Sequence, residues 1–128
     1  MVDPDTYSIA NANQAALDFY GYTYGYTKEE ITTLKSWDIN TSGEKEMKEL
    51  ISKARNKDIN RFRFKHRLKS GEIKDVEVYS SPVLLDDKIY LLSILYDVTK
   101  EERAKKFLEI LKEIERLSNI SDTEEEFL

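Results

Sequence analysis

Few residues in this chain are of a type, or at a spacing, that enzyme chemistry requires. There is one histidine, His66, and there are no cysteines. The sequence contains no Gly-rich phosphate loop, no metal-ligand spacing and no combination of nucleophile and base. The acidic pairs at 86–87 and 101–102 stand at a predicted turn and a predicted helix start, where solvated carboxylates need no further role. We therefore predict no enzyme activity, no catalytic residue and no metal site.

His66 belongs to a segment in which apolar and basic residues alternate. Phe62, Phe64 and His66 share one face, as in a strand with one buried side. The imidazole has two interpretations, a ligand-binding or pH-sensing group in a pocket and a hydrogen-bonded structural histidine, and we favour the second. The candidate ligand-binding residues of this segment and the two strand-like segments after it are Phe62, Phe64, His66, Val78, Ser80, Leu92 and Ile94.

The basic and aromatic residues have plainer interpretations than ligand recognition. A basic row on one face of a strand is a candidate for phosphate or RNA contacts. Asp75 and Glu77 of the next segment are expected to lie opposite this row and neutralise it, so we expect no nucleic-acid binding. We interpret Trp37 and the tyrosines at 20–26 as packing residues. The members of the basic row are Arg61, Arg63, Lys65, Arg67 and Lys69.

Three short helices are predicted in the first half of the chain, each with its own start signal. Asn13 is a good N-cap, and Gly21 is a stop signal for the helix that follows it. Capping boxes at 27–30 and 41–44 start two more helices. These three helices are expected to end near Tyr20, Leu34 and Lys57. Residues 20–27 contain Tyr-Gly-Tyr-Thr twice, and we predict a loop there because glycine opposes a continuous helix.

The second half of the chain changes to a strand period. A short strand is already predicted over 8–12. From residue 60 onward, three segments with strand-like composition are separated by turn residues at 70–71 and 86–88. We predict consecutive antiparallel strands over 60–68, 73–85 and 89–96. Three such strands after a set of short helices indicate an α+β domain.

The last predicted strand runs without a spacer into a charged amphipathic helix. Asp97 follows the strand, and Thr99 with Glu102 forms a capping box that starts the helix, predicted over 100–118. Its apolar stripe either folds back on its own domain or pairs with a second chain as a short coiled coil, and we favour a homodimer. The residues of this stripe are Phe107, Ile110, Leu111, Ile114 and Leu117.

Composition and charge restrict the partners and the cellular location that we expect for this chain. The chain has 128 residues and a net charge of −5, which fits one soluble domain with no overall attraction to nucleic acid or anionic lipid. No run approaches the roughly 18 apolar residues of a membrane span. The first residues lack the basic and apolar regions of a signal peptide. We therefore predict a cytoplasmic location and no membrane contact for this segment.

The order of elements resembles that of the PAS domain, a sensor fold with a five-stranded antiparallel sheet and short helices on one face. The resemblance is carried by the sequences at 12–22, 27–31, 66–71 and 97–99, the last of which is similar to the family's Asp-x-Thr signature. We therefore predict an α+β, PAS-like five-stranded antiparallel sheet and a C-terminal amphipathic helix. Only two residues precede the Asp-Pro turn, so the central first strand is expected to be truncated, with strand exchange between chains as one outcome.

The resemblance implies a module of histidine kinases or diguanylate cyclases. On that basis we expect a PAS sensor domain at 1–99, a signalling and dimerisation helix at 100–118 and, at 119–128, a linker into an effector domain of the same chain. Asp97 and Thr99, with Glu102 of the capping box, would transmit a small-ligand or partner signal. The alternative is a purely structural homodimerisation domain with a filled core and no ligand.

The identity of a cofactor does not follow from the sequence. Haem-binding relatives carry an axial histidine on the helix before the first of the three strands, and residues 44–57 contain none. Light-sensing relatives form a flavin adduct with a cysteine, which this chain lacks. We therefore expect neither haem of that type nor a cysteine-adduct flavin.

Overall fold

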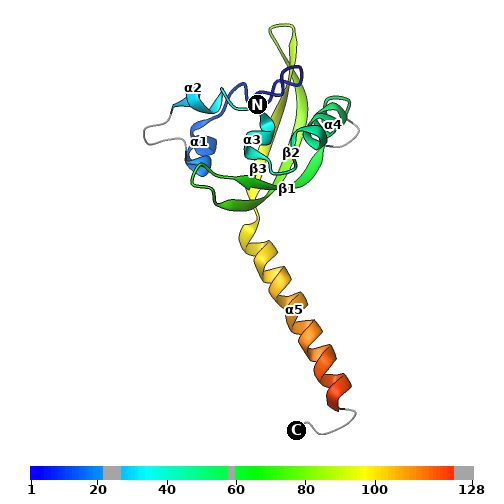
Figure 1. Cartoon of the computed structure of the whole chain (residues 1–128). Helices are drawn as coiled ribbons and strands as arrows, with labels where there is room; N and C mark the ends of the chain where they lie inside the picture. The colour runs from blue at the N-terminus through cyan, green and yellow to red at the C-terminus, as the bar shows by residue number, and fades with distance from the viewer. Residues whose placement is uncertain (22–26, 58–59, 123–128) are drawn as a thin grey trace. The chain divides into compact units, whose positions relative to one another are not determined.

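The computed structural model describes residues 1–21, 27–57 and 60–122. The chain divides into two compact units, Met1–Asp97 and Val98–Leu128. Most of the second Tyr-Gly-Tyr-Thr copy lies outside the described residues, so the loop expected there stays a prediction. Figure 1 shows the elements and their labels.

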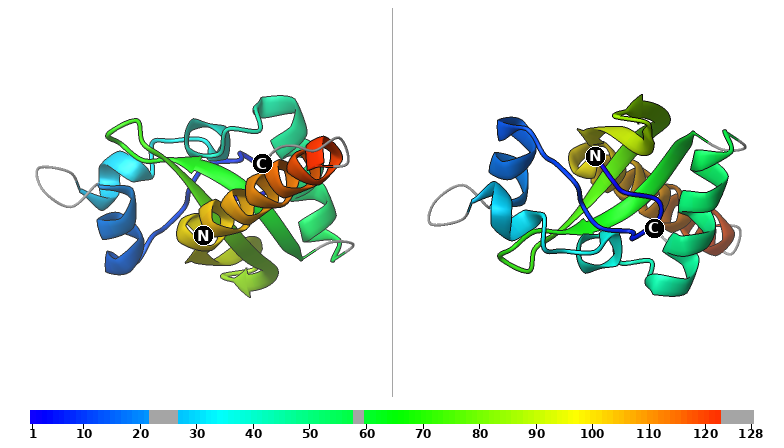
Figure 2. Two further views of the ribbon diagram at one scale, coloured as in Figure 1. Left: turned by 90° about the horizontal axis from the view of Figure 1, so that it is seen from below. Right: turned by 90° about the horizontal axis from the view of Figure 1, so that it is seen from above.

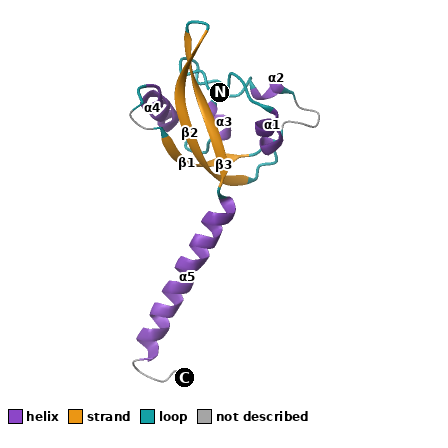
Figure 3. Cartoon of the chain, turned by 180° about the vertical axis from the view of Figure 1, so that it is seen from behind, coloured by secondary structure: helices purple, strands orange, loops and turns teal. Residues whose placement is uncertain are grey.

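The first unit is built on an antiparallel sheet of three strands in the order β1-β2-β3. The strands are β1 (Arg61–Arg67), β2 (Ile73–Leu85) and β3 (Lys88–Asp97). These bounds confirm the three strands predicted from residue 60 onward, to within about one residue at each end. Figure 3 shows the sheet from behind.

The prediction of five strands was wrong for the described part of the chain. The segments that would supply the other two, including the strand predicted over 8–12, are reduced to isolated bridges: Val2 pairs with Ile9 and with Leu91, and Ser8 pairs with Lys35. A strand needs consecutive pairs, and the turn at 3–6 interrupts the pairing with a proline, which has no amide to donate. Val2 still exchanges two backbone hydrogen bonds of 2.8 Å with Leu91, so it occupies one position beside β3. Strand exchange between chains stays a prediction.

Two short helices begin at the predicted caps. Asn13 Oδ1 accepts from the Ala16 amide at 2.9 Å at the start of α1 (Gln14–Tyr20), and Gly21 follows this helix with a φ of 83°. The Thr27 hydroxyl accepts from the Glu30 amide at 3.4 Å at the start of the second helix. The bounds of the other helices of this unit are α2 (Lys28–Ile31), α3 (Ser36–Ile39) and α4 (Glu44–Arg55).

The second helix ends earlier than predicted. It stops at Ile31, three residues before the expected end at 34, and the four-residue α3 that follows was not predicted. Thr32 and Thr33 donate their hydroxyl protons to the carbonyl oxygens of Glu29 and Glu30, at 3.0 and 2.7 Å. These side chains therefore hydrogen-bond to carbonyl groups near the helix end. In this way threonine competes with the backbone amides that would continue the helix.

The capping box predicted at 41–44 was wrong. The N-cap of α4 is Gly43, which makes no side-chain cap. Thr41 instead donates its hydroxyl proton to the Lys65 carbonyl oxygen of β1 at 2.9 Å. The Thr41 side chain therefore makes a tertiary contact with β1 in place of the predicted local cap of α4.

The helices of the first unit cover one face of the sheet, and the core beneath them forms two clusters. The first cluster joins α1 to α3 and includes Leu17 and Ile31. The second joins α4 to the sheet through Ile51 and Leu91, and Trp37 packs against it, as predicted. In both views of Figure 2, α1 and α4 are far apart, with the strands between them. The two ends of the covered face are thus packed by different helices.

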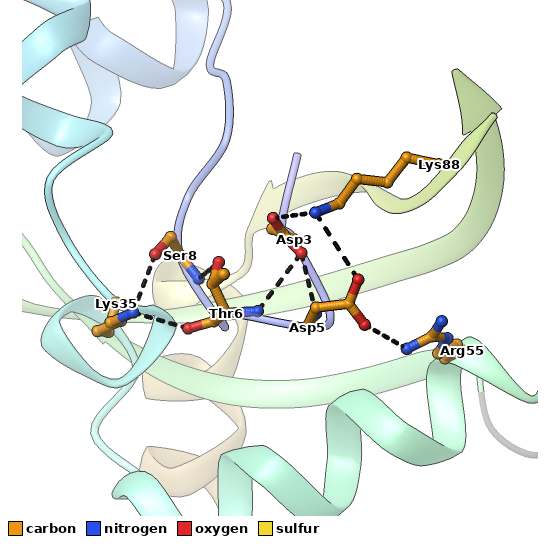
Figure 4. A network of polar contacts seen from close by, with 7 residues as sticks. All are labelled: Asp3, Asp5, Thr6, Ser8, Lys35, Arg55 and Lys88. Carbon is orange, nitrogen blue, oxygen red and sulfur yellow. Dashed lines mark hydrogen bonds and ion pairs between the residues drawn. The ribbon is translucent and has the colours of Figure 1, made fainter. Parts of the chain in front are cut away.

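A polar network fastens the amino-terminal turn (Figure 4). Lys88 Nζ lies 2.8 Å from Asp3 Oδ2, and Arg55 Nη1 lies 2.8 Å from Asp5 Oδ1. Lys35 donates to the carbonyl oxygen of residue 6 at 2.8 Å. These contacts tie the turn to β3, α4 and the residue before α3, and so help to hold the preceding residues beside β3.

The turn between β2 and β3 gives a direct test of the hairpin geometry. Asp86 and Asp87 have φ values of 49° and 63°, the left-handed region of a type I′ turn. Glycine carries no steric cost there, so Asp87→Gly is expected to raise the free energy of unfolding by about 0.5 kcal/mol in urea titrations. Ser81→Gly is the control, because it places glycine within the extended backbone of β2 and should lower stability. Lower stability in Asp87→Gly would contradict the turn type.

Candidate functional site

A cavity of about 630 Å³ borders the covered face of the sheet and the helices above it. Ligand pockets in proteins commonly measure about 300–1,000 Å³. Apolar side chains form most of the wall, including Ile31 of α2, Ile51 of α4 and Val78 of β2. Residues of β3, among them Leu91 and Asp97, also border it. The cavity therefore contacts the strand that leads out of the first unit.

All seven predicted ligand-binding residues border this cavity, but they do not share one face of the sheet. Phe62, Phe64, His66, Val78 and Ser80 lie on the helix-covered face. The other two, on β3, lie on the opposite face. That any of the seven binds a ligand stays a prediction.

The register of the hairpin explains the difference on β3. Ser80 pairs with Ser93, so Ser93 shares its face, whereas Leu92 and Ile94 point the other way and are 46% and 56% exposed. Because β3 is apolar almost throughout, its composition carries no alternation that would indicate its buried face. Counting pairs outward from the two-residue turn at 86–87 would have found the inward residues, which include Leu91 and Ser93.

An aromatic ladder, formed by Phe62, Phe64 and His66, is the β1 part of the wall. The rings of Phe62 and Phe64 lie 5.3 Å apart at 10°, and those of Phe64 and His66 lie 5.9 Å apart at 15°. The period of two along the strand places these three rings on one face at successive positions. One side of the cavity is thus aromatic, formed by rings that stack on one another along β1.

His66 is a buried, hydrogen-bonded histidine, as the favoured interpretation predicted, and it also borders the cavity. Its Nδ1 lies 2.8 Å from the Tyr20 hydroxyl, and its Nε2 lies 3.4 Å from Asn40 Nδ2. Asn40 Oδ1 accepts from the Ser42 amide at 3.0 Å, which fixes the orientation of the amide group. Sequence reasoning missed both partners, which lie 46 and 26 residues away along the chain.

This orientation assigns the tautomer of His66. Asn40 Nδ2 can only donate, so Nε2 accepts, and the imidazole proton lies on Nδ1 and is donated to the Tyr20 oxygen. Burial lowers the pKa of His66 to about 4, and burial also raises the pKa of Tyr20 above its usual range. Both groups are therefore neutral near pH 7, and the Tyr20 hydroxyl keeps a proton that its bond to His66 does not use.

The opposite face of β1 and β2 carries the predicted charge pairs. Arg61 Nη2 and Arg63 Nε each lie 2.7 Å from Glu77 Oε2, and Lys65 Nζ lies 2.7 Å from Asp75 Oδ1. The hydrogen bond from Arg61, followed by those from the hydroxyl of residue 79 and from Arg63, lowers the pKa of Glu77 to about 2. The acidic residues contact the basic row as expected, whereas the absence of nucleic-acid binding stays a prediction.

The described ranges 1–21, 27–57 and 60–122 contain neither a metal site nor a membrane span. Within them, no three histidine, aspartate or glutamate side chains are grouped as they would be around a metal ion. None of the helices in this part of the chain is both long and apolar enough to span a membrane.

The strand β3 is joined to the last helix by a single residue. Asp97 ends β3 and borders the cavity, and α5 (Thr99–Asp122) starts two residues later. The Glu102 amide donates to the Val98 carbonyl oxygen at 2.9 Å, which closes the first turn. The helix continues past the end predicted at residue 118 because 119–122 contains neither glycine nor proline.

Comparison with known proteins decides the family. Residues 1–100 match the family described as PAS domain. The chain belongs to the PAS family. A PAS domain from Desulfitobacterium hafniense superposes with a TM-score of 0.65 at 16% identity, over 75% of this chain and 87% of that one. The PAS domain of an HTR-like protein from Haloarcula marismortui gives 0.61 at 21% identity, over 75% and 76%. These two structures show the fold.

A curated relative shows the context in which a similar PAS domain occurs. Diguanylate cyclase DgcM of Escherichia coli K12 is 30% identical over 114 residues, which cover 85% of this chain and 26% of the relative. The same protein of E. coli O157:H7 matches with the same identity and coverage. This PAS domain thus spans about a quarter of the length of the curated relatives that it matches.

Proposed function

We propose that this PAS domain is a non-catalytic sensory module of a larger cytoplasmic signalling protein, in which the effector domain follows in the same chain. The observation that carries the proposal is the path of β3, which borders the cavity and leads within two residues to α5. The similarity to a diguanylate cyclase supports an effector of that class or of the histidine kinase class. A homodimer formed through α5 would carry the output.

The relay depends on three residues at the junction. A ligand in the cavity, or a partner at the sheet, shifts β3. Asp97 and Thr99 pass that shift to the first turn of α5, and Glu102 completes the turn. Thr99 is buried, so its position depends on the packing around it rather than on solvent. A change at the end of β3 then alters how two α5 helices pair.

Replacing the junction residues tests the relay. In the full-length protein, Asp97→Ala or Thr99→Ala is expected to abolish the stimulus-dependent change in effector output, typically a factor of about 5–150 for coupled sites, and to leave the fold intact. Glu101→Ala is the matched control, because it removes an exposed side chain of the same helical turn. Circular dichroism checks the fold. Unchanged signalling in both junction variants would contradict the relay.

The alternative is a structural homodimerisation domain with a filled core. Native mass spectrometry of the purified protein separates the two functions. A small molecule that is retained by the native protein and released on denaturation supports the sensory module. Its absence, together with a dimer whose output responds to no stimulus, supports the structural domain.

A further inference from the structure

The cavity wall offers hydrogen-bond donors and few charges. Ser80 and Ser93 face each other across β2 and β3 with their hydroxyl oxygens 2.7 Å apart. One hydroxyl donates to the other, so the second proton of the pair has no acceptor among the described residues. Ser36 borders the same cavity, and its buried hydroxyl has no hydrogen-bond partner in the described part of the chain.

Tyr20 adds a further hydroxyl donor to the wall. Its oxygen accepts from His66 Nδ1, so its own proton is also available to an acceptor. Among the described residues, charges at the wall are confined to the exposed side chains of Lys28 and Asp97 and to the Met1 ammonium group, which donates to a carbonyl oxygen at 2.8 Å. A ligand inside the cavity therefore meets apolar groups and uncharged polar groups, among them these hydroxyl donors, and no buried side-chain charge from the described ranges.

The aromatic ladder and the serine pair lie on the same face of the sheet. Phe62 pairs with Val78, and Ser80 is the next inward residue along β2. Diagonal neighbours on one face of a sheet are about 7–8 Å apart, which is within the length of a bicyclic aromatic molecule. A flat ring system packed against the ladder therefore places a substituent at the serine pair. Rings gain from offset or edge-to-face packing against other rings.

We propose that the cavity binds an uncharged aromatic carbonyl compound, whose rings pack against Phe62 and Phe64 and whose oxygen accepts a hydrogen bond from the Ser80–Ser93 pair. This inference rests on the proposed sensory function and names the ligand class of that site. It also connects the ligand to the relay, because Ser93 belongs to β3. An anionic ligand is disfavoured because the cations at the described wall are the exposed side chain of Lys28 and the terminal ammonium group, which already donates to a carbonyl oxygen at 2.8 Å.

Three naphthalenes that differ in one substituent test the ligand class. They are 2-acetylnaphthalene, 2-ethylnaphthalene, which has a similar shape without the acceptor, and the anion 2-naphthoate. Titrations of the 128-residue protein, followed by amide NMR shifts, are expected to give about tenfold tighter binding of the ketone than of the hydrocarbon, the effect of one hydrogen bond. The anion should bind most weakly. Shifts should centre on Ser93 and Phe64.

A double variant tests the donor. Ser80→Ala with Ser93→Ala removes both partners of one hydrogen bond, so neither hydroxyl is left buried without the other and the fold should persist. Its affinity for the ketone should fall to that for the hydrocarbon, while affinity for the hydrocarbon is unchanged. Ser81→Ala, which removes an exposed hydroxyl from the other face of β2, should change neither.

The outcomes separate the ligand class from the sensory function. Equal binding of ketone and hydrocarbon, preference for the anion, or a preference for the ketone that survives in the double variant would overturn the ligand class and leave a ligand-binding cavity. Failure of all three compounds to bind would also overturn it. The sensory function itself is decided by the Asp97 and Thr99 variants.

Discussion

Lowering the pH from about 7.5 to about 5 is expected to reduce the free energy of unfolding of this PAS domain by about 2 kcal/mol. The cause is His66, whose pKa burial lowers from 6.5 to about 4. A group with a lowered pKa of this kind binds protons more readily in the unfolded chain. Its stabilising effect is therefore complete above pH 6.5 and is lost progressively as the pH falls toward 4.

The hydrogen bonds around His66 act in the same direction as burial. A second imidazole proton would lie on Nε2, where it would face the donor Asn40 Nδ2. Rotating the amide to present its oxygen would break the bond from the Ser42 amide to Asn40 Oδ1. Protonation thus costs a hydrogen bond in addition to desolvation.

Chemical denaturation at several pH values measures this effect. Carboxylates contribute little above about pH 5, because aspartate and glutamate titrate near about 4 in unfolded chains. Hydrogen bonds and Lys88 hold the pKa of Asp3 below its usual range although burial alone would raise it, so that its stabilising effect is lost at still lower pH.

His66→Gln is the matched variant for the pH test. It replaces the imidazole by a neutral polar side chain, so its free energy of unfolding should fall by about 2 kcal/mol less than that of the unaltered protein between about pH 7.5 and about pH 5. The Met1 ammonium group, whose pKa burial also lowers, is present in both proteins and contributes equally to both slopes. Equal slopes in the two proteins would show that His66 is not the group that titrates.

The sequence predicted the local elements of this fold better than its long-range pairing. Asn13 and Gly21 act within a few residues of their own positions, and the structure confirms both. The opposite charges of Lys65 and Asp75 are also visible from sequence, because a short hairpin turn places the two strands in register. Local patterns are sufficient where the interacting residues are close along the chain.

Contacts between distant segments explain what the sequence did not predict. Thr41 lost its expected capping role to a bond with Lys65, 24 residues away. The two partners of His66 come from α1 and from the residue after α3, and no periodicity links them to β1. The cavity is the clearest case, because its wall combines side chains of most elements of the first unit. Its inward residues on β3 follow from pairing and not from composition.

Replacing Ile114 by aspartate is expected to abolish self-association of this chain. Phe107, Ile110, Ile114 and Leu117 recur at alternating three- and four-residue spacing, the a and d positions of a coiled coil, and all are exposed. Each of these side chains is about half exposed in a single chain. Burying them all between two copies contributes about 10 kcal/mol of hydrophobic free energy to association, before the costs of association are subtracted. Association costs about 4–15 kcal/mol, so we expect the proposed helix pair to be weak. Burying one carboxylate on each chain should then cost more free energy than the pair gains.

Sedimentation equilibrium over a concentration series measures the effect, which should be a loss of affinity of at least about 100-fold. Leu108→Asp is the matched control. Leu108 is 57% exposed and Ile114 is 54% exposed, so both variants exchange a similar apolar surface for the same charge. Leu108 lies outside the a and d positions, and its variant should still associate. If both variants lose association equally, general charge repulsion explains the result; if neither does, the dimer forms through another surface.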